Sequence, residues 1–239
     1  MKVLFAILLV GVCANALPQA LFENEFSTRE ERIVTNQIKR AIEQLRRDIK
    51  AAGLDPLLIE KYEGSTSPVP ILVTIAGKIE NLEFTGLSNI AINDLDYSTL
   101  RNRLRFDISL PQLSLSIGNS EVRANVFGNR YNGRLSGNLG ITQIRVSGEV
   151  RVNVGIISGV SIRSVDAKFR IQNIKSALAV LFQGEDYSDT VNALLNETVP
   201  QLLDTYKEEI DKYLSDLIKE VGNDALGRTI MIENEDMIL

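Results

Sequence analysis

The sequence predicts an α+β protein in which a strongly curved antiparallel β-sheet wraps around a long C-terminal α-helix, with a second long helix near the N-terminus. Apolar residues recur at helical spacing in two stretches, 34–52 and 191–221, and alternate with polar residues across 69–172 between them. The parity of this alternation shifts several times. Such shifts are typical of β-bulges, which increase the twist and curvature of a sheet.

The N-terminus has the features of a secretory signal peptide over residues 1–16. Lys2 precedes an apolar run over 3–13, and the small-residue pattern Ala14-Asn15-Ala16 marks the expected cleavage site. The apolar run is too short to anchor the chain in a bilayer. We therefore expect a secreted, extracellular protein without an integral membrane anchor, folded as one module over residues 17–226 and followed by a flexible tail at 227–239.

The first helix is predicted to begin near Ser27, which forms a capping-box spacing with Glu30. An apolar stripe then extends to Ala52, and Gly53 is expected to end the helix. After it we expect a turn with a short apolar segment over Leu54–Ile59 and a loop over Gly64–Pro70.

Strands are predicted from Val69 onward. The face carrying Val73 and Ile75 changes parity near Asn81, which predicts a bulge, and Gly86–Asn89 is expected to be a turn. Pro111 is expected at a strand bend or an edge position. Further strands follow, each with an apolar inner face and a charged outer face: 90–95, 104–117, 135–154 and 165–172.

The C-terminal helix is predicted over Asp186–Val221, with Gly222 as its stop and Pro200 as a bend. At ~1.5 Å per residue it would be roughly 50 Å long, and the curved sheet is the surface that can cover its apolar stripe. Ser176–Gly184 is expected to be a short apolar helix or turn that leads into it.

Several kinds of chemistry are missing from the sequence. The chain has no His and no Trp, and its single Cys, Cys13, lies in the predicted signal peptide, so Ser-His-Asp and Cys-His catalysis and the common zinc sites are excluded. No Walker A motif is present, and Asp94 with Asp96 fits a solvated turn better than a calcium site. A net charge of −5 without a basic run argues against nucleic acid. We expect no enzyme, cofactor or metal.

The inward apolar residues fit either a dry core or a ligand cavity, and patterning leaves both open. Asn196, in Asn196-Glu197-Thr198, is the glycosylation candidate. Tyr206 and Tyr213 share one helix face and offer hydroxyl groups to a ligand. The candidate cavity-lining residues are Phe84, Phe106, Ile108, Leu113, Phe169, Leu181, Phe182, Leu203, Tyr206 and Tyr213.

Several short motifs resemble the arthropod juvenile hormone-binding and takeout-like secreted proteins of the tubular lipid-binding superfamily. They are Asp55-Pro56-Leu57-Leu58-Ile59, Gly86-Leu87-Ser88-Asn89, the Leu104–Leu113 segment with Pro111, Leu181-Phe182-Gln183-Gly184-Glu185 and Leu194-Leu195-Asn196-Glu197. Group 7 mite allergens are the second-best resemblance. The resemblance implies a haemolymph-type carrier with a hydrophobic tunnel between sheet and helix. The chain departs from the hormone-binding branch because it lacks that branch's N-terminal disulfide.

Two functions follow as expectations. The first is a secreted carrier that binds a hydrophobic small molecule, such as a terpenoid or fatty acid, in an internal apolar tunnel. The second is an extracellular interaction or innate-immunity protein that binds a partner or a microbial lipid without transporting it. The sequence identifies no receptor or carrier-type partner.

Overall fold

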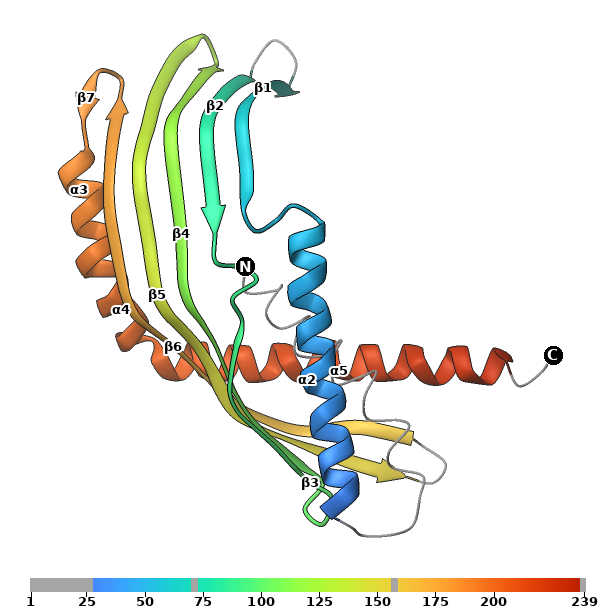
Figure 1. Ribbon diagram of the computed structural model, residues 1–239. Coiled ribbons are helices and arrows are strands. Elements are labelled where there is room, and N and C mark those ends of the chain that lie inside the picture. The colour runs from blue at the N-terminus through green and yellow to red at the C-terminus, as the bar shows by residue number, and fades with distance from the viewer. Residues whose placement is uncertain (1–27, 70–72, 156–158, 237–239) are drawn as a thin grey trace.

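The computed structural model describes residues 28–69, 73–155 and 159–236, so the predicted signal peptide lies outside the described residues. It confirms the predicted fold class: a curled antiparallel half-barrel packed against a long C-terminal helix, with a helix at the N-terminal end (Figure 1). The elements in chain order are α2 (Thr28–Ala51), β1 (Leu57–Val69), β2 (Val73–Thr85), β3 (Ala91–Ser98), β4 (Arg103–Val126), β5 (Asn129–Gly155), β6 (Gly159–Phe182), β7 (Glu185–Asp186), α3 (Ser188–Ala193), the π-helix η1 (Leu194–Thr198), α4 (Val199–Thr205) and α5 (Lys207–Asp236).

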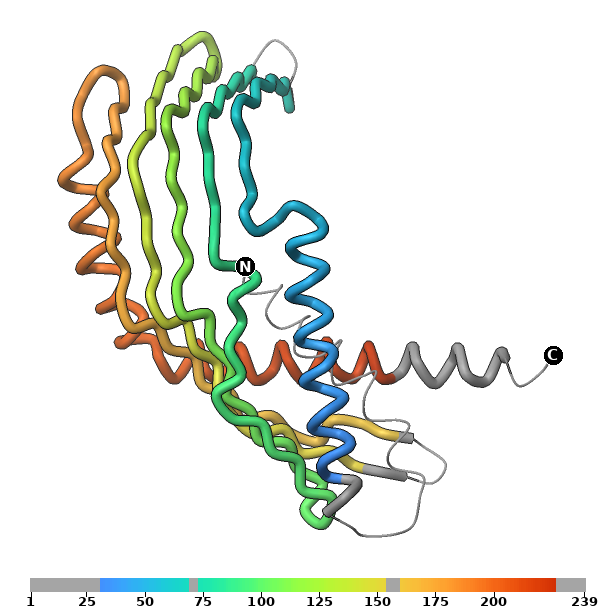
Figure 2. The backbone as a smooth tube through the Cα atoms, in the orientation of Figure 1, coloured from blue at the N-terminus to red at the C-terminus, as the bar shows by residue number. Residues whose placement is uncertain are grey.

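The sheet has the order β1-β2-β4-β5-β6-β7, and β3 pairs with β4 as well. Strands β4, β5 and β6 are 24, 27 and 24 residues long, far longer than ordinary strands. They change direction about half-way along, which divides the sheet into an upper and a lower half (Figure 2). β2 pairs with the upper half of β4, and β3 pairs with its lower half.

Pro111 lies where β4 changes its partner. β4 pairs with β3 through Ser109 and with β2 from Ser114, so Pro111 falls between the two ladders. On the other side it lies opposite Gln143 of β5, which has a positive φ of 53°. The prediction that Pro111 occupies a bend or an edge position is confirmed, because proline cannot donate to a ladder and is tolerated where none forms.

The packed core lies in the lower half of the sheet. Helix α2 contributes Val34, Ile38, Ile42 and Ile49, and α5 contributes Leu214, Ile218 and Leu226. Both helices pack against one continuous cluster of strand residues, which includes Leu104, Phe106, Ile108, Leu110, Leu113, Ile144, Val146, Val150, Val152, Val160, Ile162 and Ala167. The predicted apolar stripe of α2 is confirmed, and Gly53 follows the helix end with a φ of 66°.

The prediction of a loop over Gly64–Pro70 is wrong for the residues from Gly64 to Val69. These residues belong to strand β1, which pairs in register with β2 from Leu57 to Thr66 and again at Val69. Their small and polar side chains are nearly all exposed, so tertiary pairing with β2 rather than strand propensity determines their conformation. The short helix or turn predicted over Ser176–Gly184 is also wrong as far as Phe182, because this apolar run completes β6. Short apolar runs do not distinguish a strand from a helix by periodicity.

The C-terminal helix differs from the prediction in two ways. It consists of four segments, because a π-helical turn precedes Pro200 and a break at Tyr206, with φ −98° and ψ 25°, separates α4 from α5. A π-helical turn relieves the clash that proline makes with the preceding turn of a helix. Gly222 does not end the helix; it is buried within α5, which continues to Asp236. No helix in the described ranges is long and apolar enough to cross a membrane.

Candidate ligand-binding surface

The inner face of the upper half-sheet is an apolar surface that neither α2 nor α5 covers. Its residues form four rows across β1, β2, β4, β5 and β6, defined here as the trough. The rows are Leu57, Phe84, Leu115, Leu139 and Ser176; Ile59, Leu82, Ile117, Gly137 and Leu178; Tyr62, Ile79, Ser120, Leu135 and Val180; and Gly64, Gly77, Val122, Gly133 and Phe182.

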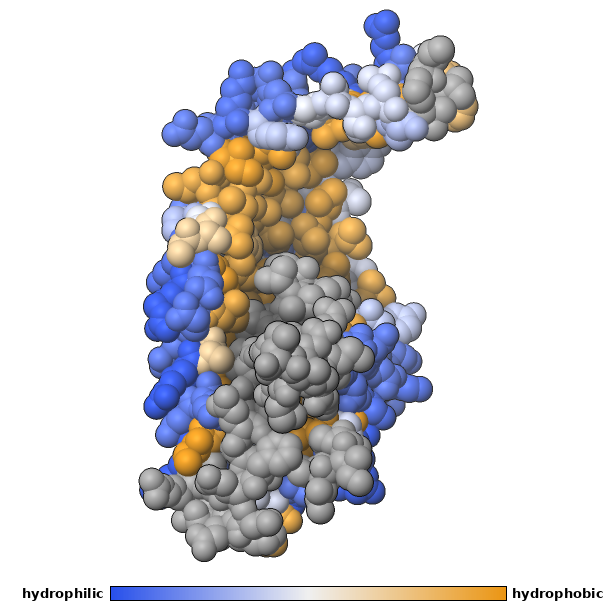
Figure 3. Space-filling model, turned by 90° about the vertical axis from the view of Figure 1, so that its right-hand side faces the viewer, coloured by the Kyte–Doolittle hydropathy of each residue, from blue (hydrophilic) through white to orange (hydrophobic). Residues whose placement is uncertain are grey.

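The trough is hollowed and open. Figure 3 shows the hydrophobic inner face of the upper half as a concave surface bordered by hydrophilic residues. Most of the large apolar side chains in the trough are half-buried, whereas Val122 and Phe182 near its upper end are 50% and 46% exposed. Contiguous exposed apolar surface is unusual in a folded monomer and marks a binding site more often than scattered apolar residues do.

A reversal of side-chain parity keeps the trough apolar along its whole length. Asn81 in β2 has a φ of 51° and lies opposite Gly118, so Leu82 and Ile79 both face inward although they are three residues apart. The bulge predicted near Asn81 is absent, because the register of β2 on β4 continues through this point. The register shift occurs one strand further on, between β4 and β5 at Ile117 and Ser120.

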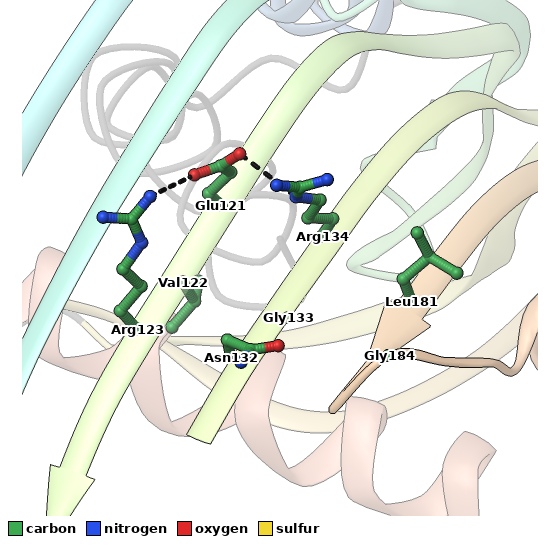
Figure 4. Close-up of a pocket in the computed structure, with 8 residues that line it drawn as sticks. All are labelled: Glu121, Val122, Arg123, Asn132, Gly133, Arg134, Leu181 and Gly184. Carbon is green, nitrogen blue, oxygen red and sulfur yellow. Dashed lines mark hydrogen bonds and ion pairs between the residues drawn. The ribbon is translucent and has the colours of Figure 1, made fainter. Parts of the chain in front are cut away.

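Charged residues occupy the outer face of the same strands. Glu121 pairs with Arg123 at 3.0 Å and with Arg134 at 3.1 Å, on a shallow polar cavity of about 310 Å³ (Figure 4). Nearby, the hydrogen bond from Lys78 and that from Asn119 hold the pKa of Glu80 below its ordinary value. None of the trough residues is ionisable except Tyr62. The trough therefore offers apolar contact without a charged anchor.

The edge of the trough at β6 is closed by polar side chains from the helices. Val180 donates its backbone N–H to Ser188 Oγ at 2.9 Å. Asn192 accepts the N–H of Leu178 and donates to its carbonyl oxygen, at 2.9 and 2.8 Å. The side-chain spacing of four residues on the helix matches the spacing of two residues on the strand. These helical residues thus act as a substitute strand, which protects an otherwise open sheet edge.

Asn196 continues this ladder. Its Oδ1 accepts the N–H of Ser176 at 2.6 Å, and its Nδ2 donates to the carbonyl oxygen of Ser176 at 3.2 Å. The side chain is exposed at the same time. Glycosylation of Asn196 stays a prediction, and it would modify the nitrogen that makes the second of these bonds.

The ten residues predicted to line a cavity are distributed over five places. Phe84 and Phe182 lie in the trough, whereas Leu181 lies on the outer face beside Arg134. Leu203 and Phe169 line a cavity of about 90 Å³ between α4 and β6. The buried core holds Phe106, Ile108 and Leu113, and the exposed surface of the C-terminal helices holds Tyr206 and Tyr213.

Several trough residues were not among the predicted lining residues. The prediction of a short helix or turn over Ser176–Gly184 leaves out Leu178 and Val180, although the half-buried positions 176, 178 and 180 alternate with exposed ones. Four other trough residues lie on strand faces that the sequence predicts correctly: Ile79, Leu82, Leu135 and Leu139. The sequence does not indicate which half of each strand the helices cover. Sequence periodicity shows which residues share a face of a strand, but it does not show whether a helix covers that face.

A match to a known protein family shows which proteins this chain is related to. The model of the haemolymph juvenile hormone binding protein family matches residues 3–231. The chain belongs to this family. The resemblance to juvenile hormone-binding and takeout-like proteins is thereby confirmed, and the family is one of hydrophobic-ligand binders. No curated protein sequence matches this member of the juvenile hormone binding protein family.

Three solved structures are similar to this family member at low identity. Takeout 1 of Epiphyas postvittana is 13% identical, with a TM-score of 0.44 over 82% of this chain and 92% of that chain. Lipopolysaccharide binding protein is 11% identical, with a TM-score of 0.28 over 80% of this chain and 37% of that chain. Latherin is 12% identical, with a TM-score of 0.15 over 92% of this chain and 93% of that chain.

Proposed function

We propose that this protein is a secreted, non-catalytic carrier that holds a hydrophobic small molecule, such as a terpenoid or fatty acid, in the trough. The observation that carries the proposal is the four-row apolar surface on the upper inner face, which the described helices leave open and from which charged side chains are absent. Membership of a hydrophobic-ligand-binding family supports it.

The driving force would be burial of the ligand's apolar surface. At ~25 cal/mol per Å², a ligand that hides roughly 300 Å² gains about 7 kcal/mol before the cost of association. Since the only hydroxyl groups in the four rows are those of Ser120, Ser176 and Tyr62, the trough would select for shape and length rather than for a charged head group. Terpenoids and acyl chains have this character.

The proposal is tested on protein secreted from insect cells and purified gently. Native mass spectrometry gives the mass of the intact complex, and organic extraction followed by mass spectrometry identifies what is released on denaturation. We expect a bound lipid or terpenoid. A ligand-free mass that stays unchanged after incubation with fatty acids and terpenoids would refute the carrier function and favour an interaction role.

A further inference from the structure

Strand β1 ends the sheet with an edge that pairs with nothing in the part of the chain that the structure describes. β1 pairs with β2 on one side only (Figure 1). The opposite end of the sheet is different, because the edge of β6 bonds to Ser188, Asn192 and Asn196. A long unpaired edge is a template for pairing with another strand.

The charges on β1 are complementary to those of a second, antiparallel copy. Two identical strands that pair about a two-fold axis place one residue opposite itself, so each register is defined by that residue. A register with a charged residue on the axis would put like charges opposite one another, which is destabilising. This applies to Glu60, Lys61 and Glu63. Tyr62 on the axis instead places Lys61 of each copy opposite Glu63 of the other.

The exposure of these side chains agrees with that register. Lys61 and Glu63 lie on the outer face and form an ion pair at 3.1 Å, with side chains that are 59% and 56% exposed, so each can exchange this partner for its counterpart in a second copy. Tyr62 faces inward, is 60% exposed, and lies over Gly64, where an added Cβ would come within 3.0 Å of its hydroxyl. Two Tyr62 rings would meet on the axis, and aromatic cross-strand pairs stabilise antiparallel sheets.

We infer that β1 pairs with β1 of a second copy of this chain, in the register that places Tyr62 opposite Tyr62. The axis is perpendicular to the sheet, so the inner faces of both copies lie on the same side. The two troughs become one continuous apolar surface with the Tyr62 pair at its centre. That last consequence rests on the proposed carrier function; the pairing itself does not.

The register is tested with single cysteines in a Cys13→Ser background. Directly opposite residues in an antiparallel pair have Cα atoms about 4.5–5.5 Å apart, within the range of a disulfide. We expect Tyr62→Cys to give a disulfide-linked dimer under mild oxidation. The matched control is Ser67→Cys on the same strand, whose two copies would be separated by about ten residues of strand and should stay unlinked. Equal cross-linking at both positions, or none at Tyr62→Cys, would overturn the register.

The charge pair is tested by exchange, with the mass in solution measured by light scattering. Wild type should be a dimer of the 26.5 kDa chain, less any cleaved leader. Lys61→Glu should dissociate it, and Lys61→Glu with Glu63→Lys should restore it. A wild-type monomer overturns the inference. Binding of the apolar probe N-phenyl-1-naphthylamine separates the two proposals, because binding by a monomer leaves the carrier function standing, and a dimer that binds no probe leaves only the pairing.

Discussion

Asn192 contacts Leu178 through two hydrogen bonds, one to the backbone N–H and one to the carbonyl oxygen of the same strand residue. The pair reproduces with a side-chain amide what a neighbouring strand would supply to the edge of β6. No residue of α3 is buried, so polar bonds rather than apolar burial attach this helix to the sheet.

Asn192→Ala should therefore destabilise the edge of the trough. Each lost hydrogen bond is worth about 1 kcal/mol, and water can replace part of it at this half-buried site, so the free energy of unfolding should fall by about 1–2 kcal/mol. Urea denaturation measures the loss, and hydrogen exchange should be faster at the Leu178 amide. Asn138→Ala on β5 is the control, because Asn138 is exposed and its side chain makes no hydrogen bond within the described ranges. Unchanged protection at Leu178 would contradict the role of Asn192.

Asp55 should make stability sensitive to acid. Its buried carboxylate accepts bonds from the N–H of Gly86 and from the N–H and hydroxyl of Ser88. Burial raises the pKa of Asp55, but these bonds together outweigh it, so the pKa lies below the ordinary 3.8. Because the pKa is lowered in the folded state, the contribution of Asp55 to the free energy of unfolding is complete above pH 3.8 and is lost as the pH falls below it.

Asp55→Asn tests this linkage. The amide keeps one acceptor oxygen but places an NH₂ group against N–H donors, so it should cost about 1–3 kcal/mol at pH 7. The difference from wild type should shrink below pH 3.8, as measured by urea denaturation at several pH values. A constant difference across this range would show that the Asp55 charge does not stabilise the Gly86–Ser88 turn.

Tyr97 should be replaceable by phenylalanine without loss of stability. Its side chain is 1% exposed, and its hydroxyl has no hydrogen-bond partner within the described ranges. Burial, with a smaller contribution from Glu31, raises the pKa of Tyr97 to about 12. The neutral form is thus preferred in the folded state, and wild type should lose stability as the pH rises from 10 towards 12.

Tyr97→Phe removes the unpaired hydroxyl and should leave stability unchanged or raise it by up to about 1 kcal/mol. Thermal unfolding at pH 7 measures the effect of removing the hydroxyl, and thermal unfolding above pH 10 measures the loss of stability at alkaline pH. The variant should lack the part of that alkaline loss that is due to ionisation of Tyr97. A clear destabilisation at pH 7 would indicate that the hydroxyl has a partner outside the described residues.

The sequence predicted the fold class, helix α2 and the bend at Pro111, because each depends on a local pattern. It did not predict strand β1 or the last residues of β6, where pairing with a neighbour decides the conformation. Gly222 is a stop signal by propensity, yet it is buried inside α5 next to Asn223, which bonds the backbone of Ile162. Tertiary contacts override propensity at such positions.

The candidate surface was predicted less well than the fold. Phe106 and Phe84 belong to the same kind of strand face, but Phe106 lies inside the core cluster, whereas Phe84 is half-buried and lies in the trough where it borders that cluster. Tyr206 and Tyr213 share a helix face, as their spacing predicts, but that face is turned to solvent. Helix placement is a long-range property that periodicity does not encode.

The most direct test of the trough compares two neighbouring residues of β6 with opposite orientation. Val180 lies in the trough and Leu181 on the outer face. Titration with N-phenyl-1-naphthylamine, after urea denaturation has shown both variants folded, measures the affinity. Val180→Asp should weaken binding at least about ten-fold, since it places a charge against an apolar ligand, and Leu181→Asp should change it by less than about two-fold. Equal losses, or undiminished binding by folded Val180→Asp, would contradict the assignment of the trough as the ligand site.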